Sequence, residues 1–291
     1  MVRFAPATAL SVYQQSLIAA LSAAEHIAAL PQLPTGLLAL NATFYLQSYL
    51  PPAVYRAGLA EAQRLASVER HRWRQSPGTP AGSVELEQLL QAGTPRPSLY
   101  RWLFEQALAT ADPLRLLLAQ HACEMAEALD DRALGLALRF GLLELPAATP
   151  SALASAAVPP VATLLEALSR ALLCRRISAA QFIERLLMLH AANRAHALSL
   201  DAYSAPLALV APLIVPLLTE ATMQHVPSRL RVTQPCALAQ RALGPLPGHA
   251  SGMAALVVEA GLVEAEILSS GPHLLLLAAV DRVLSNKPLA S

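Results

Sequence analysis

Charged and aromatic residues are scarce in this chain of 291 residues. Asp, Glu, Lys and Arg make up 14% of it, against about 25% in an average soluble domain, and Phe, Trp and Tyr make up 4%. Because strands favour aromatic and β-branched residues, which are few here, the composition argues against an all-β fold. Leu, Ala, Arg, Gln and Glu are abundant and favour helix, so we expect an all-α protein.

Positive and negative residues are nearly equal in number, which gives a formal net charge of +1. Such a chain has no overall electrostatic field that would attract nucleic acid, so we do not expect nucleic-acid binding. The three cysteines, Cys123, Cys174 and Cys236, lie far apart and cannot all pair within one chain. This pattern is typical of the cytoplasm or another reducing compartment.

Motifs that reveal enzyme chemistry are missing. The sequence contains no P-loop, no GxGxxG fingerprint, no GxSxG and no HExxH. We therefore predict no catalytic residue and no cofactor, and the pattern favours a non-enzymatic protein without excluding an enzyme.

The strongest candidate for a membrane span is the uncharged run of residues 202–219, which has the minimum length for one. It contains Pro206, Pro212 and Pro216, each of which removes a backbone donor and disturbs a helix. The run therefore predicts a buried, kinked core helix, and we do not expect integral membrane insertion.

Helical periodicity, capping residues and prolines divide the chain into many short helices. The expected ranges are 7–30, 36–50, 53–75, 83–92, 99–111, 113–129, 131–145, 161–176, 179–200, 235–243, 253–268 and 273–285. Short connections predict a multi-helix bundle or an irregular stack of antiparallel helical hairpins. Residues 146–160 are rich in Ala, Ser and Pro, and either separate an N-terminal half, 1–145, from a C-terminal half, 161–291, or form an ordered loop.

The most suggestive spacing of chemical groups is that of His121 and Glu124, three residues apart on one expected helix, with Glu105 on the helix before. An imidazole and a carboxylate at this spacing point from one helical face, as in the metal sites of helical bundles. No second motif of this kind supplies the remaining ligands, so we predict no metal and interpret the three as a surface network. Their alternative role is as polar groups of a ligand-binding pocket. His190 and His196, six residues apart, are expected on different faces rather than as joint ligands.

A second candidate is the basic and aromatic segment that contains Arg70, Arg72, Trp73 and Arg74. It could bind an anion or an acidic partner. Arg70 and Arg74 lie one turn apart while Arg72 points elsewhere, which favours a solvated helix end instead.

Three functional hypotheses follow from the excess of apolar residues, which reaches 55% with a mean hydropathy of +0.43. The first is a non-catalytic scaffold or interaction subunit that covers apolar surface with a protein partner or a second copy. The second is a helical enzyme or binding protein, with or without the assistance of a metal, that has an internal pocket for a hydrophobic ligand where Glu105, His121 and Glu124 converge. The third is peripheral membrane contact through residues 202–219 or the first helix.

Overall fold

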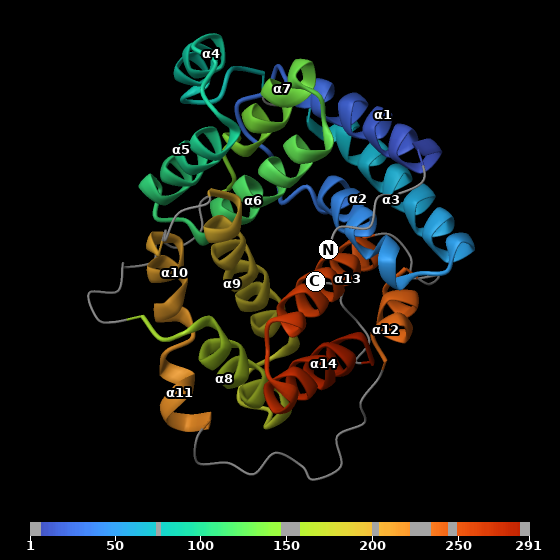
Figure 1. Ribbon diagram of the computed structural model, residues 1–291, viewed down its shortest axis with the longest axis vertical. Helices are drawn as coiled ribbons and strands as arrows, with labels where there is room; N and C mark the ends of the chain where they lie inside the picture. The colour runs from blue at the N-terminus through green and yellow to red at the C-terminus, as the bar shows by residue number, and fades with distance from the viewer. Residues whose placement is uncertain are drawn as a thin grey trace.

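The computed structural model describes residues 7–73, 77–146, 158–199, 204–221, 234–243 and 249–285. Within these ranges the chain forms fourteen α-helices, two short 3-10 helices and no β-strand, which confirms the predicted all-α fold (Figure 1).

Seven α-helices precede residue 146. They are α1 (Ala7–Ala24), α2 (Thr35–Tyr45), α3 (Pro52–Trp73), α4 (Ser83–Gln91), α5 (Arg96–Ala109), α6 (Pro113–Ala128) and α7 (Asp131–Gly141), with the 3-10 helix η1 (Leu46–Tyr49) after α2. Seven more follow. They are α8 (Val161–Leu173), α9 (Ala179–Ser199), α10 (Ala205–Val210), α11 (Pro216–Ala221), α12 (Pro235–Ala242), α13 (His249–Glu266) and α14 (Ser270–Ser285), with η2 (Ala211–Leu213) between α10 and α11.

Capping side chains fix several helix starts as the sequence predicts. The Asp112 carboxylate accepts a hydrogen bond from the Leu114 amide at 2.9 Å, and that of Asp130 accepts one from the Ala133 amide at 3.1 Å. At the start of α9 the Ser178 hydroxyl and the Gln181 side chain accept hydrogen bonds from each other's backbone amides. This reciprocal pair is a capping box.

Several helix boundaries differ from the prediction, and two of them have a clear structural cause. The first helix ends at Ala24 rather than at residue 30, because the backbone that follows it pairs with Glu144. The Leu30 amide donates to the Glu144 carbonyl oxygen at 2.8 Å, and the Glu144 amide donates to the Ala28 carbonyl oxygen at 3.1 Å. The fifth helix begins at Arg96, directly after Pro95, so Ser98 is not its cap.

The apolar run 202–219 does not form the single kinked helix that we predicted. Its described part breaks into α10, η2 and α11, with Pro206 in the first turn of α10, Pro212 inside η2 and Pro216 at the start of α11. Among the described residues, no helix is both long and apolar enough to cross a membrane.

Four helices meet in the middle of the molecule (Figure 1). Helix α13 packs against α2 and α9, and α6 packs against α9 and α2. Two of these helices come from the range 1–145 and two from 161–291. Most of the predicted connection, residues 147–157, lies outside the described residues, and the division into two halves stays a prediction.

Most large apolar side chains of the described residues are buried. The exposed ones are Val12, Ile18, Val68, Val84, Val215, Ile267 and Leu274. They are distributed over several elements, so the interior of the molecule accounts for much of the high hydropathy.

Candidate metal centre

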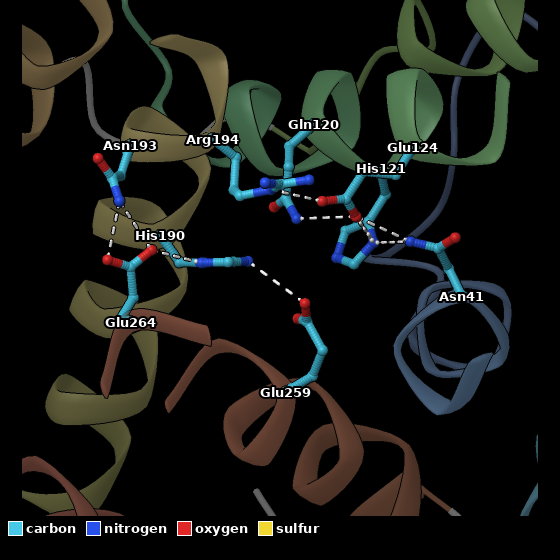
Figure 2. Close-up of polar contacts among 9 residues, drawn as sticks. All are labelled: Asn41, Gln120, His121, Glu124, His190, Asn193, Arg194, Glu259 and Glu264. Atoms are coloured by element: carbon cyan, nitrogen blue, oxygen red, sulfur yellow. Dashed lines mark hydrogen bonds and ion pairs between the residues drawn. The ribbon is translucent and has the colours of Figure 1, made fainter. Parts of the chain in front are cut away.

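A cluster of polar side chains fills the place where α2, α6, α9 and α13 meet (Figure 2). This central cluster consists of Asn41 from α2, Gln120, His121 and Glu124 from α6, His190, Asn193 and Arg194 from α9, and Glu259 and Glu264 from α13. The imidazoles of His121 and His190 and the carboxylates of Glu124, Glu259 and Glu264 are at most 2% exposed. Burying charged groups is costly unless they are paired, so the partners of each group matter.

Helical spacing brings these groups together within each element. On α6, Gln120 and Glu124 lie four residues apart and therefore share one face of the helix. On α9, Asn193 and Arg194 follow His190 by three and four residues, so these three side chains also share one face. On α13, Glu259 and Glu264 lie five residues apart, about 1.4 turns. They therefore approach His190 from two different sides.

Glu124 is held by three donors. Its Oε1 accepts a hydrogen bond from Arg194 Nε at 2.9 Å, and its Oε2 accepts from Asn41 Nδ2 at 3.0 Å and from Gln120 Nε2 at 3.1 Å. Burial raises the pKa of Glu124, but Arg194, through its charge and its hydrogen bond, and the imidazoles of His121 and His190 together outweigh burial and keep the pKa below its ordinary value. Glu124 is therefore ionised at neutral pH.

His190 lies between two carboxylates. Its Nδ1 is 2.7 Å from Glu264 Oε1, and its Nε2 is 3.5 Å from Glu259 Oε1, which is too long for a hydrogen bond. Asn193 Nδ2 donates to both oxygens of Glu264, at 3.1 and 2.9 Å, and so fixes the carboxylate that orients the ring. Burial lowers the pKa of His190, but Glu259 and Glu264 outweigh it and raise the pKa to about 10.

Two buried polar atoms of the central cluster have no hydrogen-bond partner in the part of the chain that the structure describes: Nε2 of His190 and Oε1 of Gln120. Unpartnered polar atoms are rare in protein interiors and call for an explanation such as a bound ion or water. The Nε2 of His190 points at Glu259, and this ion pair is the only one that the Glu259 carboxylate makes among the described residues, where it has no hydrogen bond.

The orientation of His121 follows from its neighbours. The Tyr13 hydroxyl donates to Asn41 Oδ1 at 2.6 Å, so Asn41 Nδ2 faces Glu124 and, at 2.9 Å, His121 Nδ1. Because Asn41 donates to Nδ1, the proton of the neutral ring is on Nε2. Burial lowers the pKa of His121, which keeps the ring neutral.

Glu124, His190 and Glu259 have the composition and spacing of a metal site. One donor atom from each lies within 4.8 Å of the other two. Two donors on one metal ion at ~2.1 Å are at most ~4.2 Å apart, so small rotations of the glutamate side chains bring the three into range. One imidazole and two carboxylates suit Zn²⁺, Mn²⁺ or Fe²⁺.

The structure brings two of the three predicted pocket residues together. His121 and Glu124 lie inside the central cluster rather than in a surface network, so that interpretation is wrong for them. Glu105 does not join them, contrary to the prediction that all three converge. Its side chain is 49% exposed and pairs with Arg101 at 3.2 Å, because the adjacent Leu103 and Phe104 face the core.

The basic and aromatic segment does not form one surface patch among its described residues. Trp73 is buried, Arg72 is exposed, and the half-buried Arg70 donates to the Ala19 carbonyl oxygen and to the Ser67 hydroxyl, both at 3.1 Å. Arg74 lies outside the described residues. Anion or partner binding by this segment stays a prediction.

A hollow of about 280 Å³ lies between α1 and α3, and its lining includes Ser16, Gln63 and Arg70. None of Glu105, His121 and Glu124 lines it. It is therefore not the pocket expected from those three residues.

Comparisons with family models, curated proteins and solved structures find no match for this chain. The geometry of the central cluster is therefore the basis for a functional assignment.

Proposed function

We propose that this protein binds one divalent transition-metal ion through Glu124, His190 and Glu259. The observation that carries the proposal is the buried Nε2 of His190, which has no hydrogen-bond partner among the described residues and points toward Glu259. An imidazole nitrogen next to two carboxylates is a ready set of metal ligands.

The charge of the central cluster supports a cation. Its carboxylates, Glu124, Glu259 and Glu264, carry three negative charges, and Arg194 with a protonated His190 carries two positive ones, which leaves one negative charge in excess. A divalent ion that replaces the proton on His190 brings the sum to zero. Because an uncompensated buried charge is costly, the folded protein gains stability when the ion binds.

The contacts behind His190 resemble those that support metal-bound histidines in general. Such a histidine usually donates its second ring N–H to a carboxylate, which fixes the tautomer and the ring orientation. Glu264 supplies this carboxylate at 2.7 Å, and Asn193 holds Glu264 in turn. The nitrogen ligand favours a transition metal over Mg²⁺ and Ca²⁺, which prefer oxygen ligands only.

The proposal can be tested by titrating chelator-treated protein with Zn²⁺ and Mn²⁺ in a calorimeter while its thermal midpoint is followed. We expect one ion per chain and a raised midpoint with at least one of the two metals. His190→Gln and Glu259→Gln should each abolish both effects.

Two matched controls keep the test specific. His196→Gln changes an exposed histidine on the same helix, and Glu105→Gln changes an exposed carboxylate. Both should bind metal like the unaltered protein. Absence of binding by the unaltered protein, or unchanged binding by His190→Gln, would contradict the proposal.

A further inference from the structure

The three proposed metal ligands leave the coordination of the ion incomplete. A tetrahedral zinc site has four ligands, and sites with three protein ligands take an exogenous fourth ligand. His121 is the nearest remaining imidazole of the central cluster, with Nδ1 3.8 Å from Glu124 Oε2.

His121 cannot serve as that fourth ligand in its present hydrogen bonding. Asn41 donates to its Nδ1, so the opposite nitrogen, Nε2, carries the proton and has no lone pair for a metal. Turning the Asn41 amide over would face its oxygen toward the Glu124 carboxylate, which accepts but cannot donate. His121 therefore presents an N–H donor, and Figure 2 shows this edge of the ring turned toward the space between His190 and Glu259.

Arg194 presents further donors to the same centre. Its Nε binds Glu124 Oε1 at 2.9 Å, and its two terminal nitrogens have no hydrogen-bond partner among the described residues. The side chain is 27% exposed, whereas Glu124 is 1% exposed, so Arg194 connects the central cluster to solvent. A guanidinium with free terminal nitrogens is suited to bind a planar oxyanion through two hydrogen bonds.

We infer that the metal ion holds an exchangeable small oxyanion of the carboxylate class, which accepts hydrogen bonds from Arg194 and from His121 Nε2. This inference rests on the proposed function, since the metal supplies one of the three contacts. Arg194 and His121 both offer N–H groups to the ligand, which selects negatively charged oxygen. The negative charge would lie beside the guanidinium at the solvent-facing edge of the cluster, where water screens it.

The inference can be tested with cobalt and formate. Co²⁺ is added to the metal-free protein, its visible absorption is recorded, and sodium formate is titrated at constant ionic strength with sodium chloride as the balancing salt. We expect a saturable change in the spectrum with formate and none with chloride.

Substitution of Arg194 separates a ligand contact from a structural role. In Arg194→Gln a cation beside Glu124 is gone, so Co²⁺ should bind as tightly as before or more tightly, while the affinity for formate falls about tenfold or more. Arg185→Gln, on the same helix but outside the central cluster, should leave both affinities unchanged.

If circular dichroism shows that Arg194→Gln does not fold, His121→Phe tests the second donor. It should keep Co²⁺ and bind formate more weakly. A protein that does not bind Co²⁺ at all contradicts the proposed metal site itself. A Co²⁺ spectrum that formate does not alter, or formate binding that neither substitution weakens, overturns the inference and leaves the metal site in place.

Discussion

Replacing His190 with Gln should destabilise the metal-free protein strongly, whereas replacing Glu259 with Gln should not. His190 is the partner of two buried carboxylates, at 2.7 Å from Glu264 and 3.5 Å from Glu259. Removing its charge takes the nearest cation away from both, and breaking a buried ion pair from one side typically costs about 3–5 kcal/mol. Glu259→Gln removes the excess negative charge instead and leaves His190 paired with Glu264, so we expect a change within about 1 kcal/mol.

The assay is urea unfolding of both variants in the presence of a chelator, followed by circular dichroism. If the slopes with denaturant agree, the difference between midpoints gives the change in the free energy of unfolding. The double variant His190→Gln with Glu259→Gln should be more stable than His190→Gln alone, because one of the two unpaired carboxylates is then neutral.

Metal ions provide the second half of the test. At a free metal concentration about 100-fold above Kd, the free energy of unfolding of the unaltered protein should rise by about 2.7 kcal/mol. Both single variants should lose this increase. Equal destabilisation by the two substitutions in the metal-free state, or a cost below about 1 kcal/mol for His190→Gln, would refute the charge balance described here.

Three further predictions concern other parts of the molecule. The Tyr55 hydroxyl is buried and has no hydrogen-bond partner within the described ranges, so Tyr55→Phe should be as stable as the unaltered protein or more stable in urea unfolding. Burial raises the pKa of Tyr55 to about 12, so its ionisation favours the unfolded state as pH rises from about 10 to 12, and the variant should lose less stability over that range. The Glu69 carboxylate accepts hydrogen bonds at the start of α2, from the Gly36 amide at 2.9 Å and from the Leu37 amide at 3.3 Å. Glu69→Gln should therefore lower the free energy of unfolding by about 1–3 kcal/mol in the same assay. An unchanged unfolding midpoint would contradict this role of Glu69. The assembly hypothesis predicts a mass well above the 30.8 kDa of one chain in light scattering, and a monodisperse monomer without a partner would contradict it.

Local signals explain why the helices could be predicted from the sequence. Asp112 and Asp130 mark helix starts because their side chains satisfy backbone amides within the same few residues. The end of the first helix could not be found in this way. It depends on backbone hydrogen bonds to Glu144, which is more than a hundred residues away.

The central cluster could be predicted only in part, because it too depends on contacts between residues far apart in the sequence. His121 and Glu124 share a helical face, so their spacing alone indicated a joint site. His190 and Glu259 join them through the packing of α9 and α13 against α6 and α2, which no spacing in the sequence records. The one local signal was Glu259 and Glu264 in a mostly apolar helix, since carboxylates among apolar residues need buried partners.

A buried polar network can also have a purely structural role. In the central cluster, a structural role and metal binding make different demands on one carboxylate, that of Glu259. Arg194, Asn41 and Gln120 satisfy Glu124, and His190 and Asn193 satisfy Glu264, so both would be complete in a purely structural network. Among the described residues Glu259 makes a single ion pair, 3.5 Å from an imidazole nitrogen that lacks a hydrogen bond there, so it adds buried charge without a matching bond. A bound metal ion would give Glu259 a ligand bond and would link α6 from the range 1–145 to α9 and α13 from 161–291. Chelation should therefore loosen the packing between these helices before it unfolds either range, which hydrogen exchange of their backbone amides can measure.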